Sequence, residues 1–401
     1  MDDNLFAGLK VIDCASFIAA PAAATTLADF GADVIKIEPP GEGDLYRALR
    51  AAPGYPVSDF NYPWIVDNRN KRSIALDLKT AEGNAILHRL AEQADIFITT
   101  MPLPVRERLK IRFEDLAPRN PRLIYASFTA YGETGLEAGK TGFDSTAYWA
   151  RSGLMDNVKP SFDAPPARSV AGMGDHPSAM ALYGAIVTAL YRRERTGKGG
   201  KVSSSLIANG LWANGVLVQA QLCGATMIPR PPREQLPNGC TNMYRSRDDR
   251  WLTLSVLNEA RQFEPLLQAL ERPDIADDER FSTLEARRRN SRALIALFDE
   301  IFATRDLADW RVRLDAAGIT FGVTGRLEDI PDDLQMREAG ALVPYGDGEI
   351  LTVSSPFTID GLEKEPARPA PEIGEHGDEI LRELGYDPAE IARLRLSGAV
   401  G

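Results

Sequence analysis

One aspartate stands out for its surroundings, because glycines precede it and a histidine and a proline follow it. Residues 172–177 read GMGDHP, so Asp175 and His176 come just before Pro177. Helices tolerate proline at their first position, and we predict a helix that begins at Pro177 with His176 as its N-cap. A carboxylate there lies at the positive end of the helix dipole, among backbone N–H groups that can also stabilise an oxyanion. The pattern suits a carboxylate nucleophile, and it also suits an aspartate that only caps a helix.

Two neighbouring groups compete for a role beside Asp175. His176 is a candidate general base, although adjacent residues on a turn usually point apart, and a packing role is the alternative. Asp144 ends the segment TGFD at residues 141–144, ahead of a helix predicted near Ser145. It is therefore either a second carboxylate of the site or an N-cap.

Basic residues bracket two of the predicted strands. The segment NKRS at residues 70–73 and Lys79 flank one strand, and Arg108 follows another. Such side chains can bind nucleotide phosphates at the edge of a sheet, and the alternative is that each is a solvated surface cation. With a net charge of −11 the chain is not expected to bind nucleic acid or an anionic membrane, but a local basic pocket can still take a small anion.

Neither a metal centre nor secretion is expected. The cysteines (Cys14, Cys223 and Cys240) and the three histidines have no metal-type spacing, which favours reduced thiols packed as small hydrophobes. The first residues, MDDNLF, lack a basic segment ahead of an apolar run. No stretch reaches the ~20 apolar residues of a membrane span. We therefore expect a cytoplasmic protein.

The elements that must position Asp175 alternate between strands and helices. Apolar runs typical of buried strands occupy residues 9–14, 33–38, 73–77, 95–99 and 123–128, and helical patterns occupy residues 21–30, 81–93 and 177–195. Strand–helix–strand units of this spacing predict an α/β fold with a doubly wound parallel sheet, whose ligands bind beyond the carboxyl ends of the strands. No G-x-G-x-x-G follows the first strand, so a dinucleotide cofactor is not expected.

Several segments, in order along the chain, resemble one family of enzymes. They are LKVID at 9–13, LADFGADVIKIE at 27–38, GD at 43–44, NKRSIALDLK at 70–79, GD at 174–175, TGKGG at 196–200 and GEH at 374–376. This ordered set resembles the family III CoA-transferases, which include formyl-CoA, carnitine and bile-acid CoA-transferases. The resemblance runs essentially from end to end.

The resemblance implies a fold and a reaction. It implies a Rossmann-like large domain from residues 1–200 and 331–401, a smaller α/β domain with linkers over residues 205–330, and an interlocked homodimer. It implies that Asp175 attacks an acyl-CoA thioester, forming an aspartyl anhydride and then an aspartyl-CoA thioester that reacts with a carboxylic acid. Coenzyme A and acyl-CoA are substrates in this scheme, and no metal or tightly bound cofactor is implied.

The resemblance also implies which residues contact CoA. These positions are Ile18, Leu76, Lys79, Thr100, Arg108 and Tyr131. The chain departs from formyl-CoA transferase at Ile18, Thr100 and Pro39, where that enzyme has glutamine, asparagine and arginine. Other groups would have to replace those three contacts. There is also no glycine-rich loop like the one over that enzyme's active site, so oxalate is not expected as a substrate.

A rival activity exists in the same family. α-Methylacyl-CoA racemases use the matching aspartate together with the histidine of a Gly-His-Asp segment as two bases. Here that segment reads GFD at residues 142–144, and Phe143 cannot transfer a proton, so a racemase is the less favoured alternative. A CoA-binding protein without activity is the third.

The same region predicts the kind of substrate. Residues 142–153, GFDSTAYWARSG, together with GDH at 174–176 resemble the bile-acid and 2-hydroxyacyl-CoA transferase branch. This resemblance predicts a bulky or aromatic carboxylic acid. Tyr148, Trp149 and Met155 are candidates for an apolar acyl pocket, with core packing as the alternative for each.

Overall fold

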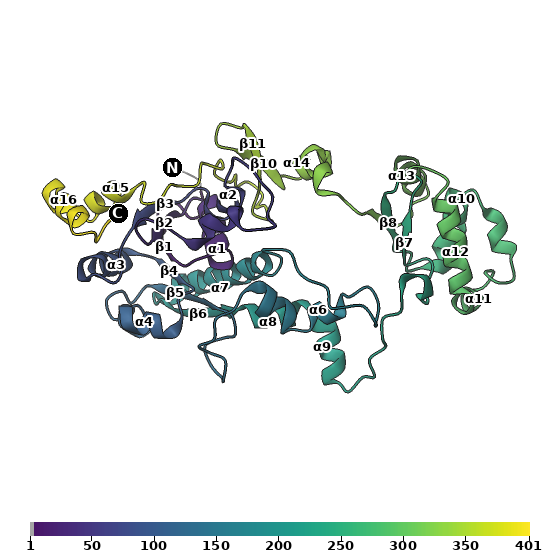
Figure 1. Ribbon diagram of the computed structural model, residues 1–401, viewed down its shortest axis with the longest axis horizontal. Helices are drawn as coiled ribbons and strands as arrows, with labels where there is room; N and C mark the ends of the chain where they lie inside the picture. Colours follow the sequence, from purple (N-terminus) through teal and green to yellow (C-terminus); the bar gives the residue numbers. More distant parts are fainter. Residues whose placement is uncertain (1–3) are drawn as a thin grey trace. The chain divides into compact units, whose positions relative to one another are not determined.

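The computed structural model describes residues 4–401, which divide into two compact units (Figure 1). The first unit contains residues 4–155, 168–220 and 334–401, and the second contains residues 156–167 and 221–333. The chain therefore leaves the first unit twice and returns to it twice. The two helices directly after residue 205, over residues 206–213 and 215–222, belong mainly to the first unit.

A six-stranded parallel sheet forms the centre of the first unit, in the order β3-β2-β1-β4-β5-β6. The strands are β1 (Lys10–Cys14), β2 (Asp33–Glu38), β3 (Arg72–Ala75), β4 (Ile96–Thr99), β5 (Ile124–Thr129) and β6 (Gly200–Ser205). The strand order reverses between β1 and β4, and ligands of doubly wound sheets bind at such a switch point. The predicted α/β class with a Rossmann-like sheet is confirmed.

Helices cover both faces of this sheet. They are α1 (Ala19–Asp29), α2 (Tyr62–Asn68), α3 (Ala81–Gln93), α4 (Leu103–Leu109), α5 (Phe113–Leu116), α7 (Asp175–Thr196), α8 (Leu206–Ala213), α15 (Gly377–Glu383) and α16 (Pro388–Leu396). A 3-10 helix η1 (Leu45–Ala51), a π-helix η2 (Asp144–Ala150) and a hairpin of β10 (Leu342–Tyr345) and β11 (Ile350–Val353) complete the unit, and the short helices α6 (Leu154–Asn157) and α9 (Gly215–Leu222) cross its boundaries. The short helix α14 (Leu334–Glu338) lies beside β10, a strand of this hairpin.

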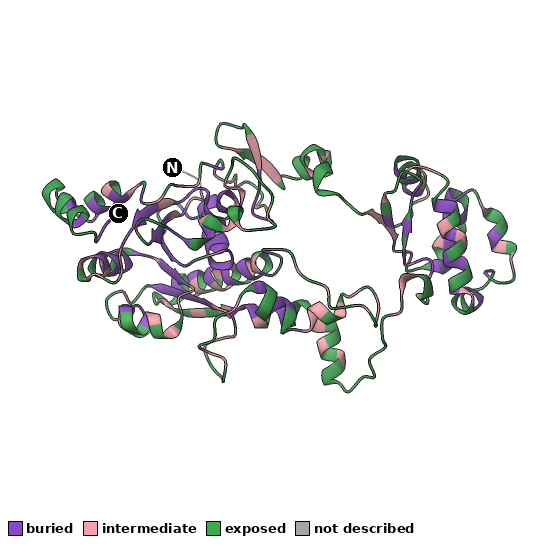
Figure 2. Ribbon diagram, viewed as in Figure 1, coloured by how far each residue is buried: buried purple, intermediate pink, exposed green. Residues whose placement is uncertain are grey.

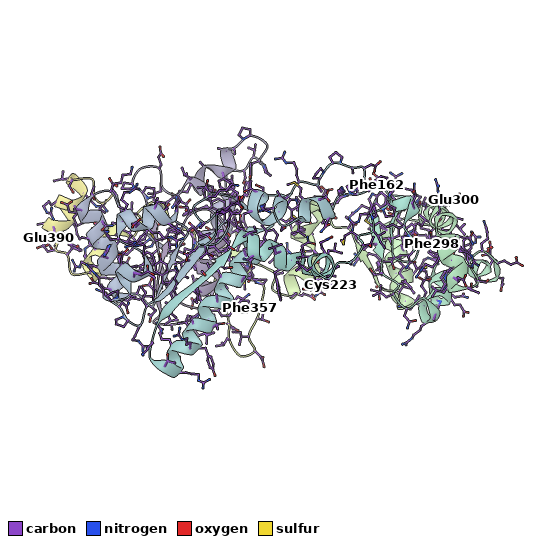
Figure 3. All side chains as sticks on the ribbon, turned by 90° about the horizontal axis from the view of Figure 1, so that it is seen from below. Phe162, Cys223, Phe298, Glu300, Phe357 and Glu390 are labelled. Carbon is purple, nitrogen blue, oxygen red and sulfur yellow. The ribbon has the colours of Figure 1, made fainter. Side chains whose placement is uncertain are left out.

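Successive residues of one strand enter two different apolar cores. Val11 belongs to the core that contains α1 and α7, whereas Ile12 belongs to the core that contains α3, α15 and α16. The strands β1, β4 and β5 are therefore buried on both faces (Figure 2), which explains why their sequences are mainly apolar. The edge strand β6 is polar and more exposed. Phe357 (labelled in Figure 3) stacks on Phe30 at 5.0 Å between ring centroids, so residues of the C-terminal part complete the first core.

The second unit has its own core. Its antiparallel sheet, in the order β7-β8-β9, is made of β7 (Met243–Arg245), β8 (Trp251–Leu254) and β9 (Phe321–Val323). Its helical segments are η3 (Arg233–Gln235), α10 (Glu259–Ala269), η4 (Pro273–Asp277), α11 (Leu284–Arg289), α12 (Ser291–Phe302), α13 (Leu307–Ala316) and η5 (Leu327–Asp332). The ring of Tyr244 stacks on Phe302 at 4.9 Å and meets Phe298 edge-on, which ties this sheet to α12.

Within residues 4–401, no helix combines the length and the apolar character that crossing a membrane requires.

Candidate active site

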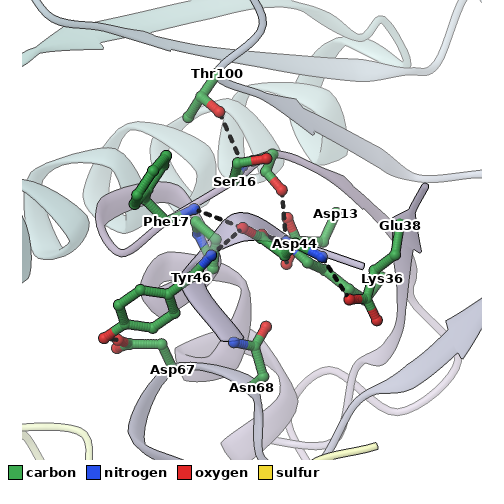
Figure 4. A network of polar contacts seen from close by, with 12 residues as sticks. Asp13, Ser16, Phe17, Lys36, Glu38, Asp44, Tyr46, Asp67, Asn68 and Thr100 are labelled. Carbon is green, nitrogen blue, oxygen red and sulfur yellow. Dashed lines mark hydrogen bonds and ion pairs between the residues drawn. The ribbon is translucent and has the colours of Figure 1, made fainter. Parts of the chain in front are cut away.

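A cavity of about 660 Å³ lies where the carboxyl ends of β1, β4 and β5 meet. Its wall is formed by residues 16–19 after β1, by residues 100–103 after β4, and by residues 128–130 at the end of β5. The Ser16 N–H donates to Oγ1 of Thr100 at 2.9 Å, which joins the first two loops (Figure 4). The cavity therefore occupies the switch point of the sheet, the place predicted from the strand order.

Asp175 reaches this cavity from the first turn of α7. The prediction that the helix begins at Pro177 was wrong by two residues. The His176 N–H already donates to the Gly172 carbonyl at 3.0 Å, so the helical hydrogen bonds start earlier. Pro177 is the third helical residue, where a backbone N–H would also lack a partner inside the helix.

The Asp175 side chain does not cap this helix. Gly174 is the N-cap, and no described residue donates a hydrogen bond to the Asp175 carboxylate. The capping alternative left open by the sequence therefore does not describe this structure. The carboxylate is half-buried and is directed at the cavity with its oxygens uncommitted.

Two glycines allow the chain to approach its neighbours at this point. A Cβ added to Gly174 would lie 2.6 Å from Cγ of Tyr148, so the buried tyrosine ring packs directly on bare backbone. Gly172 has a φ of +78°, and a Cβ there would come within 3.0 Å of the His176 ring. Both positions require glycine for space, and Gly172 also requires it for conformation.

Burial and nearby carboxylates perturb Asp175. Burial, with repulsion from Asp144 and from Asp67, raises the pKa of Asp175 to about 7, although His176 opposes this rise. Asp144 is itself buried at the start of η2 and accepts a hydrogen bond from the Gly174 N–H at 3.2 Å. Asp175 is thus partly protonated at neutral pH, and its ionised form is more basic than an ordinary aspartate. Such a group suits covalent or proton-transfer chemistry.

His176 is anchored away from the cavity. Its Nε2 lies 3.0 Å from Oδ1 of Asp67, whose Oδ2 accepts a hydrogen bond from the Tyr46 hydroxyl at 2.7 Å. Burial lowers the pKa of His176, but the hydrogen bond and the charge of Asp67 outweigh it, so the pKa is raised overall. Sequence reasoning missed Asp67 and Tyr46, because nothing in their local sequence indicates that they meet His176.

The residues implied to contact CoA fall into two groups. Ile18 and Thr100 line the cavity together with Asp175. Leu76 is buried in the second apolar core, and Lys79 and Arg108 are exposed side chains outside the cavity wall. Tyr131 is half-buried, next to the cavity residue Ala130. The role of all six in binding CoA stays a prediction.

Two of the predicted basic candidates are committed elsewhere. Lys71 is fully buried and donates to Asp13 at 2.8 Å, so it is neither a surface cation nor free to bind a phosphate. Arg72 forms ion pairs with Asp33 at 2.6 Å and with Glu383 at 2.7 Å. Both expectations for this segment are corrected by these contacts.

The aromatic wall of the cavity differs from the one considered in the sequence. Tyr148 and Trp149 are buried in the core and Met155 packs against it, so the packing alternative holds for all three. Phe17 and Phe143 line the cavity instead, with their rings edge to face at 5.3 Å between centroids. Arg168 and Lys140 add positive charge to the same wall.

No cluster of metal-binding side chains accompanies this cavity: residues 4–401 contain no group of three or more His, Cys, Asp or Glu side chains arranged to hold a metal ion.

Comparison with known proteins identifies the class. A family described as CoA-transferase family III matches residues 6–377. The crystal structure of a CaiB/BaiF family protein from Brucella suis has a TM-score of 0.83 and 30% identity, covering 94% of this chain and 98% of that one. The chain belongs to CoA-transferase family III, as the ordered segments predicted.

Two relatives whose names state an activity indicate the kind of reaction. The (R)-2-hydroxy-4-methylpentanoate CoA-transferase of Clostridioides difficile is 32% identical over 99% of both chains. The cinnamoyl-CoA:phenyllactate CoA-transferase of Clostridium sporogenes is 32% identical, covering 98% of this chain and 96% of that one. The protein is therefore a CoA-transferase, an enzyme whose substrates are CoA thioesters and carboxylic acids.

Proposed function

We propose that the protein transfers CoA from an acyl-CoA to a bulky or aromatic carboxylic acid, with Asp175 as the nucleophile. The observation that carries this proposal is the Asp175 carboxylate, which no described residue hydrogen-bonds and which faces the cavity at the switch point. In this proposal the reacting groups are the Asp175 carboxylate, the thiol of CoA and the carboxylate of the acceptor acid.

The reaction has four balanced steps. The Asp175 carboxylate attacks the acyl-CoA carbonyl and displaces CoA thiolate, which leaves an acyl–aspartyl anhydride. The thiolate attacks the aspartyl carbonyl, so the donor acid departs and an aspartyl-CoA thioester remains. The acceptor carboxylate attacks this thioester, forming a new anhydride and releasing the thiolate. The thiolate attacks the acceptor's carbonyl, which yields the new acyl-CoA and regenerates Asp175.

The electrostatics of the site favour these covalent states. The ionised Asp175 is disfavoured by burial and by the negative charges of Asp144 and Asp67. The anhydride and the thioester carry no charge on this residue, so acylation removes both penalties at once. The same perturbation that raises the pKa of Asp175 therefore supports its use as a nucleophile.

The cavity wall supports the proposed acids. Phe17 and Phe143 present aromatic rings, which favour a bulky apolar acyl group. Arg168 lines the cavity and forms no ion pair with any described residue, so we assign it to the carboxylate of the incoming acid. The two CoA-transferase relatives carry branched or aromatic acids in their names, in agreement with this choice.

A homodimer is part of this proposal. Trp212 on α8 is 87% exposed, Val216 on α9 is 85% exposed, and Leu211, Leu217 and Leu222 add further exposed apolar surface. None of the residues of α9 is buried. A surface of this kind requires a cover, and a second copy of the chain, interlocked with the first, supplies one.

Substitution of the nucleophile tests the proposal. Asp175→Ala and Asp175→Asn should lower transfer by roughly 10⁴-fold or more, because the group that forms the covalent bond is absent. CoA binding, measured by calorimetry, should stay within a few-fold of wild type. Mass spectrometry after incubation with acyl-CoA and hydroxylamine should find a modified peptide containing Asp175 only in the wild type.

The matched control is Asp360→Ala, which removes an exposed aspartate outside the cavity and should leave transfer unchanged. Substantial transfer by Asp175→Ala would refute the assignment of the nucleophile. Exchange of the α-proton with solvent, without movement of CoA between acids, would instead identify a racemase.

A further inference from the structure

A buried polar network links Asp67, Tyr46, Asp44 and Lys36 (Figure 4), and the transfer reaction does not use it directly. Asp67, in α2, is fully buried between His176 and Tyr46, at 3.0 Å and 2.7 Å. The Tyr46 N–H donates to Oδ1 of Asp44 at 3.0 Å, and Oδ2 of Asp44 accepts a hydrogen bond from Lys36 at 2.8 Å. Each carboxylate oxygen of Asp67 therefore has its own partner, His176 for Oδ1 and Tyr46 for Oδ2.

The network closes on itself through a second buried lysine. Lys71 donates to the Asp67 carbonyl at 2.8 Å and to the Asp13 carboxylate at 2.8 Å, and Asp13 lies 3.9 Å from Lys36. These charges are fully removed from solvent. Buried ion pairs contribute little net stability, because desolvation offsets their attraction. A role in positioning a solvent-exposed member therefore accounts better for the network.

That member is His176. Its side chain is 48% exposed, yet its Nε2 is held by Asp67. The Cε1 and Nδ1 atoms of the ring lie against Gly172, where even a Cβ would come within 3.0 Å of both atoms. The imidazole is therefore held on two sides, next in sequence to Asp175 on the first turn of α7.

We propose that Asp67 and Tyr46 are positioning residues, which fix His176 as an imidazolium beside Asp175 and thereby keep the nucleophile ionised. This inference rests on the proposed function, in which Asp175 must be a carboxylate in order to attack the thioester. His176 acts through its charge and forms no bond to the substrate.

The charged groups around Asp175 and His176 determine whether the pKa of each residue is raised or lowered. Asp175 is faced by Asp144 from η2 and by Asp67 from α2, both of which raise its pKa, and the cations Arg168 and Lys140 lie on the cavity wall. His176 is the one group among those that perturb Asp175 that lowers its pKa. The same carboxylates stabilise the charged imidazole, because Asp67, Asp175 and Asp144 all raise the pKa of His176.

The pH dependence of transfer tests the charge of His176. In the wild type, kcat/KM should rise with pH as Asp175 loses its proton, with a midpoint near the pKa of about 7. In His176→Gln, whose amide can still donate to Asp67, the midpoint should move up by about one pH unit. This shift means roughly eightfold lower activity at pH 6.5 and nearly wild-type activity at pH 9. An unchanged midpoint, or a loss that is equal at every pH, would overturn the inference.

A second variant tests the positioning itself. The chain has three histidines, so their imidazole signals can be followed individually by NMR titration of the full-length protein. In Asp67→Asn the titration midpoint of His176 should fall, because the attracting carboxylate is gone, and the signals of His88 and His376 serve as internal controls. In Tyr46→Phe the Asp67 carboxylate remains, so the His176 midpoint should change by less than in Asp67→Asn. A His176 midpoint that is the same in Asp67→Asn and wild type would overturn the assignment.

The two proposals fail in different ways. If wild-type protein moves no CoA, the proposed function fails and the positioning role falls with it. If transfer occurs and depends on Asp175, but His176→Gln keeps the wild-type midpoint, only the electrostatic role of His176 and its positioning by Asp67 are refuted.

Discussion

Phe17 is under backbone strain at the wall of the cavity. Its φ of +66° lies in the left-handed region, which costs a bulky side chain about 1–2 kcal/mol. The Phe17 N–H faces Oδ1 of Asp44 at 3.4 Å, and its ring meets those of Phe143 and Tyr46. Strain of this kind persists where the surroundings enforce it and is concentrated at functional sites. We therefore assign Phe17 to substrate selection.

Phe17→Gly should show whether the Phe17 ring serves substrate selection or the stability of the fold. Phe17 is only partly buried, so relief of about 1–2 kcal/mol of strain should offset part of the lost ring contacts. The melting temperature should therefore fall by less than for truncation of a fully buried phenylalanine, which costs about 3–5 kcal/mol. The kcat/KM for an aromatic acid should fall roughly tenfold, because the apolar wall is gone. Thermal unfolding and steady-state kinetics measure both.

Lys110→Gly is the matched control, since Lys110 has a φ of +57° at the end of α4, outside the cavity wall. It should gain about 0.5–1 kcal/mol and keep full activity. A large loss of stability in Phe17→Gly, with unchanged kinetics, would assign Phe17 to packing instead.

At this scale the sequence predicts single residues better than their partners. Asp175 is recognisable because the glycines and the proline around it are adjacent in the chain. Asp67 is not, because it lies 109 residues from His176 and meets it only because α2 and α7 both pack against α1. Lys71 shows the same limit, since its burial among Asp13 and Asp67 cannot be inferred from a basic segment.

Among the elements, the start of α7 matters most to the site. The bounds of β2 and α3 agree with the sequence prediction, because Gly, Pro and a Thr cap mark their ends. The predicted start of α7 is two residues late because Gly174 packs against the buried Tyr148 ring, a long-range contact, and so the helix begins before the proline. The helices α2 and α16 were not predicted at all.

Gly174→Ala should damage this element. The added Cβ would meet Tyr148 at 2.6 Å, so the first turn must shift, at a cost of about 1–3 kcal/mol. Because Asp175 is the next residue, transfer should fall more than tenfold, in excess of what the stability change explains. Chemical denaturation and kinetics at a temperature where the variant is folded give the two numbers.

Gly184→Ala, on the same helix, has open space around the added carbon. It should raise the free energy of unfolding by about 0.5–1 kcal/mol without changing transfer. If Gly174→Ala behaved in the same way, the close packing on Tyr148 would not be what sets the start of α7.

At the scale of the whole molecule, the alternation of strands and helices was enough to predict the parallel sheet. The boundaries of the two units were beyond the sequence pattern, since residues 156–167 join the second unit through contacts and not through composition. The proposed homodimer belongs to this scale as well.

Trp212→Glu tests the proposed dimer interface. A charge at this exposed apolar site should weaken association, so light scattering after gel filtration should find one chain where the wild type shows two. Leu396→Glu places the same charge on an exposed leucine of α16 and should leave the dimer intact. A wild-type protein that elutes with the mass of one chain would refute the dimer.

The late return of the chain to the first unit has a consequence for its biosynthesis. The helices α15 and α16 cover one face of the sheet. The Ser73 N–H donates a hydrogen bond to Nδ1 of His376, which lies 303 residues later in the chain. At ~5–20 residues per second, a ribosome needs roughly 15–60 s to make that intervening chain. Throughout this time, Ile12 on β1, Ile35 and Ile37 on β2, and Ile74 on β3 lack their final cover. We therefore expect the nascent chain to bind chaperones that hold apolar surfaces until synthesis has passed residue 396.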